Sequence, residues 1–275
     1  AEGFGVKRAG LAIPDSIMLI VAPGCCGRNT SMISSMPQYE DRFFYLTMDE
    51  TDIVTGRHLK KVPKAVQEIC DGLAKKPSVV MICITCVDAL LGTDMERICR
   101  KSEEKTGLPV RPCYMYALTR EGRKPPMVHV RQSLYSLLKP KKKKGNVVNL
   151  LGFFSPLMDD CELYGMLEKA GVKTVHEISR CKDYEEYQTM AEANFNLVLH
   201  PEARFAAEDF HEKLKIPFIE LRRLYQIDKI TKQYQALGKV LGLPFEDHEA
   251  ETAALDSVKH LKSAKPDAVF AIGEC

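Results

Sequence analysis

The sequence predicts an α/β protein with two tandem, doubly wound domains and mostly parallel sheets. Short apolar runs alternate with amphipathic helical patterns along most of the chain, which implies parallel strands joined by helical crossovers. The run at 79–84 is apolar on both faces of its pleat, as a strand is when helices cover both sides of its sheet. A lysine-rich stretch ends the first series of elements. We therefore predict one Rossmann-like domain over 1–145 and a second over 146–275.

In the first domain, Pro63 suits the first turn of a helix, where its missing N–H costs nothing. Thr93 and Glu96 have the spacing of a capping box for the next helix. The strands are expected at 16–22, 43–48, 79–84 and 110–116, with a last helix at 130–138.

The second domain repeats the pattern. Asp159 and Asp160 are expected to cap its first helix, and Pro201 to begin its third. Its strands are expected at 146–154, 172–178, 196–200, 217–221 and 267–272, and its helices near 160, 183, 201, 227 and 248.

Composition excludes several classes of protein. A 275-residue chain with 45% hydrophobic residues is long enough for one large or two ordinary cores. The net charge of +2 gives no field that favours nucleic acid or an acidic membrane, and no apolar stretch is long enough to span a bilayer. Without an export signal, the ten cysteines are interpreted as reduced thiols and ligands, which indicates a cytoplasmic protein.

Two groups of cysteines end predicted strands. Cys86 follows the strand at 79–84, and Cys25 and Cys26 follow the strand at 16–22. Ligands of open α/β sheets collect at the carboxyl ends of the strands, so these thiols are placed for chemistry. Cys70, Cys83 and Cys99 lie instead within apolar helix or strand patterns and are predicted to be core. The Lys139–Gly145 run is interpreted as a solvated linker, with a docking patch as the alternative.

Other site chemistries have weaker support. Cys83 and Cys86 have the CxxC spacing of a redox pair, but that pair belongs at a helix N-terminus and Cys83 lies inside a strand. No second CxxC or paired histidines suggest zinc. No glycine-rich phosphate-binding motif is present, so any ATPase must be a separate protein.

Three segments in order resemble component 1 of the nitrogenase family. They are Pro23–Cys26, Asp52–Gly56 and, most specifically, Thr85–Asp94. Residues 149–152 and 216–220 resemble the second domain of that family. The family includes nitrogenase subunits, their cofactor-assembly scaffolds, dark-operative protochlorophyllide reductase and a nickel-tetrapyrrole reductive cyclase. Its subunits carry a third such domain, so the resemblance implies that the second domain here is incomplete.

The resemblance implies an iron–sulfur cluster at Cys26 and Cys86, with Cys25 as the fallback for Cys26. Such clusters commonly take four cysteine thiolates, so a homodimer or a paralogous subunit is expected to supply the others. No cysteine precedes Cys25, which favours a [4Fe-4S] cluster over an eight-iron one. The cysteine that holds the nitrogenase cofactor would fall near Leu199 and His200; His200 is either a substitute ligand, a helix cap or a pocket residue.

Two functions follow from the resemblance. In the first, an ATP-dependent reductase similar to the nitrogenase iron protein passes electrons through the cluster to a substrate between the domains. In the second, the chain is a scaffold on which a metallocofactor is assembled. A second metallocofactor or a tetrapyrrole is expected in the crevice between the domains.

Overall fold

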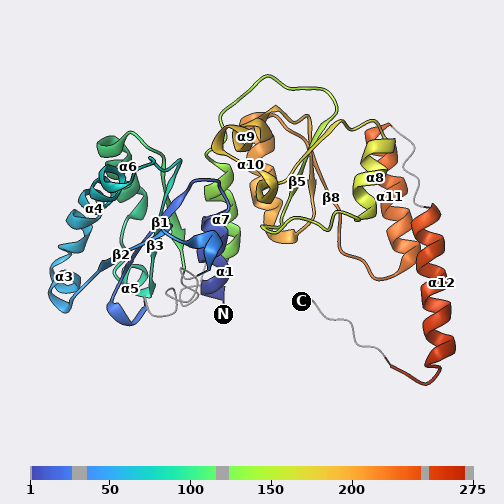
Figure 1. The fold of residues 1–275 in the computed structure, drawn as a ribbon, viewed down its shortest axis with the longest axis horizontal. Helices are drawn as coiled ribbons and strands as arrows, with labels where there is room; N and C mark the ends of the chain where they lie inside the picture. Colours follow the sequence, from blue (N-terminus) through green and yellow to red (C-terminus); the bar gives the residue numbers. More distant parts are fainter. Residues whose placement is uncertain (1, 27–35, 116–123, 243–247, 270–275) are drawn as a thin grey trace.

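The structure is a computed structural model that describes residues 2–26, 36–115, 124–242 and 248–269. It contains two four-stranded sheets, one from each half of the chain (Figure 1). The first sheet has the strand order β2-β1-β3-β4 and the second has β6-β5-β7-β8. Every pair of neighbouring strands is parallel. The predicted fold class is therefore confirmed.

The first sheet consists of β1 (Ile17–Ala22), β2 (Phe43–Thr47), β3 (Val80–Ile84) and β4 (Val110–Tyr114). Its helices are α1 (Glu2–Gly10), α3 (Glu50–Thr55), α4 (His58–Gly72), α5 (Cys86–Leu90), α6 (Met95–Thr106) and α7 (Pro126–Tyr135), and a short 3-10 turn covers Pro37–Tyr39.

Helices cover both faces of this sheet (Figure 1). Along β1, Met18 and Ile20 pack toward α1 and α7, while Leu19 and Val21 pack with the apolar side chains of α4 and α6. Side chains alternate between faces because the strand period is two residues, so a strand between two helical layers is apolar throughout. This is the pattern from which buried strands were predicted.

The second sheet consists of β5 (Val147–Leu151), β6 (Thr174–His176), β7 (Phe195–Val198) and β8 (Phe218–Glu220). Its helices are α8 (Glu162–Lys169), α9 (Tyr184–Thr189), α10 (Arg204–Leu214), α11 (Ile227–Leu241) and α12 (His248–Ala264), with 3-10 turns η2 (Ile178–Arg180), η3 (Met190–Glu192) and η4 (Pro201–Ala203). α12 contacts α11 and points away from the sheet (Figure 1), with no buried side chain. Within the described residues, no helix is both long and apolar enough to cross a membrane.

The lysine-rich run between the sheets follows a fixed path. Lys141 and Lys144 form ion pairs with Glu192 at 3.6 and 2.5 Å, and Lys143 Nζ donates to the carbonyl oxygen of Ala191 at 2.7 Å. The run lies between the two sheets, and three of its lysine side chains are bound to the second half of the chain. The domain boundary at residue 145 stays a prediction.

Three local predictions are wrong. Pro63 was expected in the first turn of its helix, but it lies inside α4, which begins at His58. The helix therefore starts more than one turn before the predicted position. Asp94, and not Thr93, caps α6 by accepting a hydrogen bond from the Arg97 N–H. The N-cap residue of α8 is Cys161, and no side chain caps this helix, so Asp159 and Asp160 do not cap it as predicted.

The predicted last strand is also not found where the structure describes it. Residues 267–269 form a turn and coil, and Val269 is 97% exposed, whereas a buried strand was expected. The remainder of that prediction, 270–272, lies outside the described residues. The apolar run gave a strand signal, but hydrophobicity alone cannot tell a strand from another apolar segment.

Candidate site at the carboxyl edge of the first sheet

Cys25 and Cys26 lie where the first strand passes into a helical turn. β1 ends at Ala22, and the Cys26 N–H donates to the carbonyl oxygen of Pro23 at 3.0 Å. The Cys25 side chain is exposed, whereas Cys26 is half-buried and packs against the core beneath α1 and α7. Of the two adjacent thiols, Cys26 is therefore the one that contacts the protein interior.

Cys86 occupies the corresponding place on the neighbouring strand. β3 ends at Ile84, Thr85 is buried, and Cys86 is the first residue of α5. Val21 of β1 is the register partner of Ile84. Because the two strands are adjacent and parallel, their carboxyl ends meet at one edge of the sheet, and both Cys26 and Cys86 follow that edge.

The Cys26 thiol lies beside that of Cys25. The Sγ atoms of Cys25 and Cys26 are 4.0 Å apart. Burial, followed by the hydrogen bond and charge of Cys25 and by the charge of Cys86, raises the pKa of Cys26.

The donors at this edge fit part of the ligand shell of an iron–sulfur cluster. Thiols are the ligands that such clusters take. The buried Thr85 hydroxyl has no hydrogen-bond partner among the described residues, and it could donate a hydrogen bond to a sulfur atom of a bound cluster. No three His, Cys, Asp or Glu side chains in the described part of the chain are arranged to hold a metal ion, so Cys25, Cys26 and Cys86 are not a complete shell.

A buried network that the sequence did not reveal holds the helix of Cys86. His58 Nε2 lies 2.9 Å from Asp88 Oδ1, and its Nδ1 lies 3.0 Å from the carbonyl oxygen of Asp52. Thr93 Oγ1 also donates to Asp88, at 3.0 Å. The only sequence signal was a carboxylate two residues after Cys86 in an apolar segment, and the partner histidine lies thirty positions earlier.

Cys83 takes no part in the thiol edge. It is fully buried in mid-strand, opposite Cys113 of β4. A hydrogen bond to Cys83, together with burial, raises the pKa of Cys113 well above its usual range. Cys70 and Cys99 are buried as well, so all three cysteines predicted to be core are confirmed as such.

A hydrophobic surface adjoins Cys86. The exposed apolar residues Val54, Leu90 and Leu91 leave 85%, 72% and 50% of their side chains accessible. Leu90 ends α5, the helix that begins at Cys86. Val54 and Leu91 border the same surface hollow. Neighbouring exposed apolar side chains of this size are typical of protein interaction surfaces.

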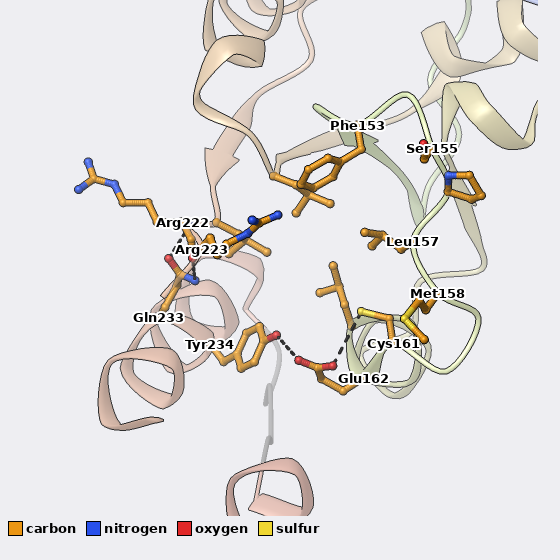
Figure 2. Close-up of a pocket in the computed structure, with 14 residues that line it drawn as sticks. Phe153, Ser155, Leu157, Met158, Cys161, Glu162, Arg222, Arg223, Gln233 and Tyr234 are labelled. Carbon is orange, nitrogen blue, oxygen red and sulfur yellow. Dashed lines mark hydrogen bonds between the residues drawn. The ribbon is translucent and has the colours of Figure 1, made fainter. Parts of the chain in front are cut away.

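A cavity of about 470 Å³ lies at the carboxyl edge of the second sheet (Figure 2). Its apolar walls include Leu157, Leu199 and Leu221, and Arg223 lies beside Phe153 with its guanidinium carbon 5.9 Å from the ring centroid. Across the cavity, the Tyr234 hydroxyl donates to Glu162 at 3.1 Å, and Glu162 also accepts a weak hydrogen bond from Cys161. Arg222 points away from the cavity (Figure 2).

Next to this cavity, His200 serves as a helix cap, one of the roles left open by the sequence. Its Nδ1 accepts a hydrogen bond from the Glu202 N–H at 3.3 Å, and its ring meets Phe153 edge-on at 5.8 Å. Arg131 of α7 donates twice to the carbonyl oxygen of Gly152 and once to the Glu202 carboxylate, at 3.0, 2.7 and 2.7 Å. One arginine from the first half of the chain therefore fixes two loops of the second.

The chain has two parallel α/β units. Thiols lie at the carboxyl edge of the first sheet and a cavity lies at the carboxyl edge of the second, which defines a class of α/β proteins with ligand sites at these edges. Residues 2–267 match the family described as nitrogenase component 1 type oxidoreductase. The chain belongs to this family.

Relatives with assigned names are similar along most of this chain. The nitrogenase iron-molybdenum cofactor biosynthesis protein NifE of Nostoc sp. is 28% identical over 260 residues, which cover 89% of this chain and 53% of that protein. NifE of Rhizobium meliloti is 28% identical over 247 residues, covering 87% of this chain and 51% of that protein. The chain thus spans about half the length of these relatives.

Solved structures show the same fold. One, described as nitrogenase Cp1 at pH 6.5, superposes with a TM-score of 0.65 at 17% identity, over 96% of this chain and 60% of that one. Another, nitrogenase Cp1 at pH 5, gives a TM-score of 0.60 at 21% identity, over 95% of this chain and 55% of that one. Both similarities agree with the tandem parallel sheets.

Proposed function

We propose that this chain is a scaffold component for assembling a nitrogenase-type metallocofactor, with an iron–sulfur cluster at Cys26 and Cys86. The observation that carries the cluster site is the position of these two thiols after adjacent parallel strands. The similarity to NifE, whose name describes cofactor biosynthesis, favours the scaffold over the catalytic alternative.

Within this proposal Cys26 is the ligand and Cys25 the fallback. Cys26 packs against the core, whereas Cys25 is exposed. Two thiols from one chain leave a [4Fe-4S] cluster two ligands short. We therefore propose that a second subunit, identical or paralogous, supplies the other two.

When bound, the cluster supplies one-electron transfer, and the chain's own residues prepare its place. Cys26 and Cys86 offer sulfur ligands from backbone that two sheet strands hold in position. His58 and Asp88 fix the helix that starts at Cys86. The exposed Val54, Leu90 and Leu91 support docking of an ATP-dependent, iron-protein-like reductase beside the cluster.

The metallocofactor under assembly is the substrate of the scaffold. Our proposed place for it is the crevice between the two halves of the chain, with the cavity of Figure 2, which residues of the second half line, as a candidate part of that site. His200 and Cys161 are candidate donors there. The nine free cysteines of the described residues, none in a disulfide, suit a reducing compartment, and so we place the protein in the cytoplasm.

Anaerobic reconstitution with iron and sulfide tests the cluster site. The parent protein is expected to gain broad visible absorption and bound iron, and Cys26→Ala and Cys86→Ala to lose most of both. Cys83→Ala is the matched control, because Cys83 lies in the neighbouring core and not at the edge. Equal loss in the Cys83 variant would overturn the assignment and restore the CxxC hypothesis.

The catalytic alternative, an iron–sulfur oxidoreductase that reduces a substrate or tetrapyrrole, has the support of the family description. The two functions differ in what happens to the bound molecule. A scaffold is expected to release an assembled metallocofactor to an acceptor protein that lacks it. Turnover of a substrate with reductase, dithionite and ATP, without such transfer, would favour the enzyme.

A further inference from the structure

Cys25 and Cys26 are adjacent thiols with different surroundings. Their Sγ atoms lie 4.0 Å apart, shortly after the end of β1. The Cys25 side chain is exposed, whereas Cys26 is half-buried and packs against the core. The proposed cluster takes one thiol of this pair, which leaves the second thiol directly beside a ligand.

The pair can be reached from solvent. Besides the exposure of Cys25, a Cβ added at Gly24 would meet no atom of the described residues within 4 Å, apart from its neighbours in the chain. Cys83 and Cys113 are also neighbours, as register partners on adjacent strands, but both are fully buried. Of these two close pairs, an oxidant in solution therefore reaches only Cys25 and Cys26.

A disulfide between adjacent residues is strained. Consecutive Cα atoms are about 3.8 Å apart across a trans peptide, whereas the Cα atoms of ordinary disulfides are about 4.4–6.8 Å apart. Strain makes a disulfide easier to reduce, and strained or exposed disulfides are the labile, regulatory ones. A bond between Cys25 and Cys26 would therefore form under oxidising conditions and open again when thiols predominate.

We propose that Cys25 and Cys26 are a site of reversible disulfide modification, with a low-molecular-weight disulfide such as oxidised glutathione as the oxidant. The Cys25 sulfur attacks one sulfur of the oxidant and releases one glutathione thiol. The Cys26 sulfur then attacks the Cys25 sulfur, forms the bond between them and releases the second glutathione thiol. Each half of the oxidant gains one electron and one proton, and each cysteine loses one of both.

The modification has a direct effect on the cluster site. An iron–sulfur cluster binds cysteine as a thiolate, and a sulfur held in a disulfide is not a thiolate. The disulfide should therefore block Cys26 as a ligand, and a bound cluster should protect Cys26 from oxidation. This effect rests on the proposed function, whereas the disulfide itself does not.

Mass spectrometry of the iron-free protein tests the disulfide. The protein is incubated anaerobically with oxidised glutathione, its remaining thiols are alkylated in denaturant, and it is digested with trypsin. The tryptic peptide 9–28 contains Cys25 and Cys26 and no other cysteine. We expect this peptide to be unalkylated and lighter than its dithiol form by about 2 Da, the mass of the two hydrogens lost. Dithiothreitol should restore the dithiol.

Cys25→Ser is the matched variant, because it keeps the shape of the side chain and removes one partner of the bond. Its peptide should show no loss of mass and carry at most one glutathione, on Cys26. The peptides with Cys83 and Cys113 are an internal control and should be alkylated throughout, because both thiols are buried in the folded protein. A parent peptide that is alkylated twice, or that carries glutathione without an internal bond, would overturn the proposal.

A second sample separates this site from the proposed function. Protein loaded with its cluster before exposure to oxidised glutathione is expected to keep the full mass of peptide 9–28. The loss of about 2 Da should return once a chelator has removed the iron. Equal loss in loaded and iron-free protein would overturn the effect on the cluster site. A protein that binds no cluster would contradict the proposed function, while the iron-free sample would still decide whether the disulfide forms.

Discussion

Asp52 joins two elements that support the thiol edge. Its carboxylate accepts hydrogen bonds from Lys61 Nζ and Arg57 Nε, both at 2.7 Å, and its backbone carbonyl oxygen lies 3.0 Å from His58 Nδ1. Through His58 it is connected to Asp88, two residues beyond Cys86. One residue of the segment that resembled the family therefore holds the corner between α3 and α4 and, indirectly, α5.

Asp52→Asn is expected to reduce the free energy of unfolding at neutral pH. Hydrogen bonds from Lys61 and Arg57 lower the pKa of Asp52 to about 2, below its usual value of about 3.9. A lowered pKa stabilises the folded state above the unfolded-state value, and this stabilisation is lost as the pH falls toward 2. Urea unfolding at several pH values should show a gap between parent and variant at pH 7 that narrows below pH 4. A gap of constant size would contradict the ion pairing.

At the residue scale, sequence predicted the cysteines better than the charges. Cys70, Cys83 and Cys99 were assigned to the core because each continues an apolar pattern, and all are buried. Lys7 and His58 gave no such signal. A polar residue in a helix is ordinarily solvated, and only the tertiary contacts of α1 and α4 turn these two side chains inward.

Among the elements, the loop after β5 depends on one glycine. Gly152 has φ of +137°, and an added Cβ would lie 2.7 Å from both the backbone nitrogen and the Cβ of His200. Its carbonyl oxygen also receives both hydrogen bonds from Arg131. A side chain there would strain the backbone and displace the capping histidine at once.

Gly152→Ala is expected to cost about 2 kcal/mol or more of unfolding free energy, measured by urea denaturation. Gly165→Ala is the matched control: Gly165 is an exposed residue of α8, and an added Cβ there has open space around it. That substitution should stabilise the protein by about 0.5–1 kcal/mol, because alanine is the better helix former. Equal effects at the two sites would show that the contact with His200 is not tight.

At the element scale, strand positions followed from the sequence while helix ends did not. A strand that is buried on both faces is apolar at successive positions, and this pattern can be recognised in the sequence without knowing which elements pack against the strand. The start of a helix depends on one or two hydrogen bonds. The Thr93 hydroxyl donates to Asp88, while Asp94 accepts the hydrogen bond from the Arg97 N–H and so caps α6. The C-terminal strand was predicted from hydrophobicity alone, and nothing packs on Val269 where the structure describes it.

For the whole molecule, cluster and subunit association are expected to be linked. Two thiols at one sheet edge leave a four-iron cluster incomplete, and a symmetric dimer would supply two more. Anaerobic chelation of iron should therefore shift the mass measured by light scattering toward monomer, and Cys86→Ala should do the same. Cys83→Ala should remain dimeric when loaded. A monomer that retains a full cluster would contradict this arrangement.

The cavity and the Arg131 contacts could not have been predicted from the sequence. The Arg131 contacts depend on how the two halves pack, and Arg131 is separated by 21 positions from Gly152 and by 71 from Glu202. The cavity depends on how loops within the second half come together, since its lining runs from Phe153 to Tyr234. The sequence pattern did predict the carboxyl edge of each sheet as the place where ligand sites form, because all strands of a parallel sheet end at the same edge.

The contacts of the lysine-rich run affect how readily trypsin can cleave it. By composition, Lys139–Gly145 is the densest run of trypsin sites in the chain. Trypsin, however, must draw several residues into an extended conformation in its own cleft. Lys143 and Lys144 are bound to Ala191 and Glu192, so this run must first detach from the second half of the chain. Cleavage within this run therefore requires that these contacts be released first.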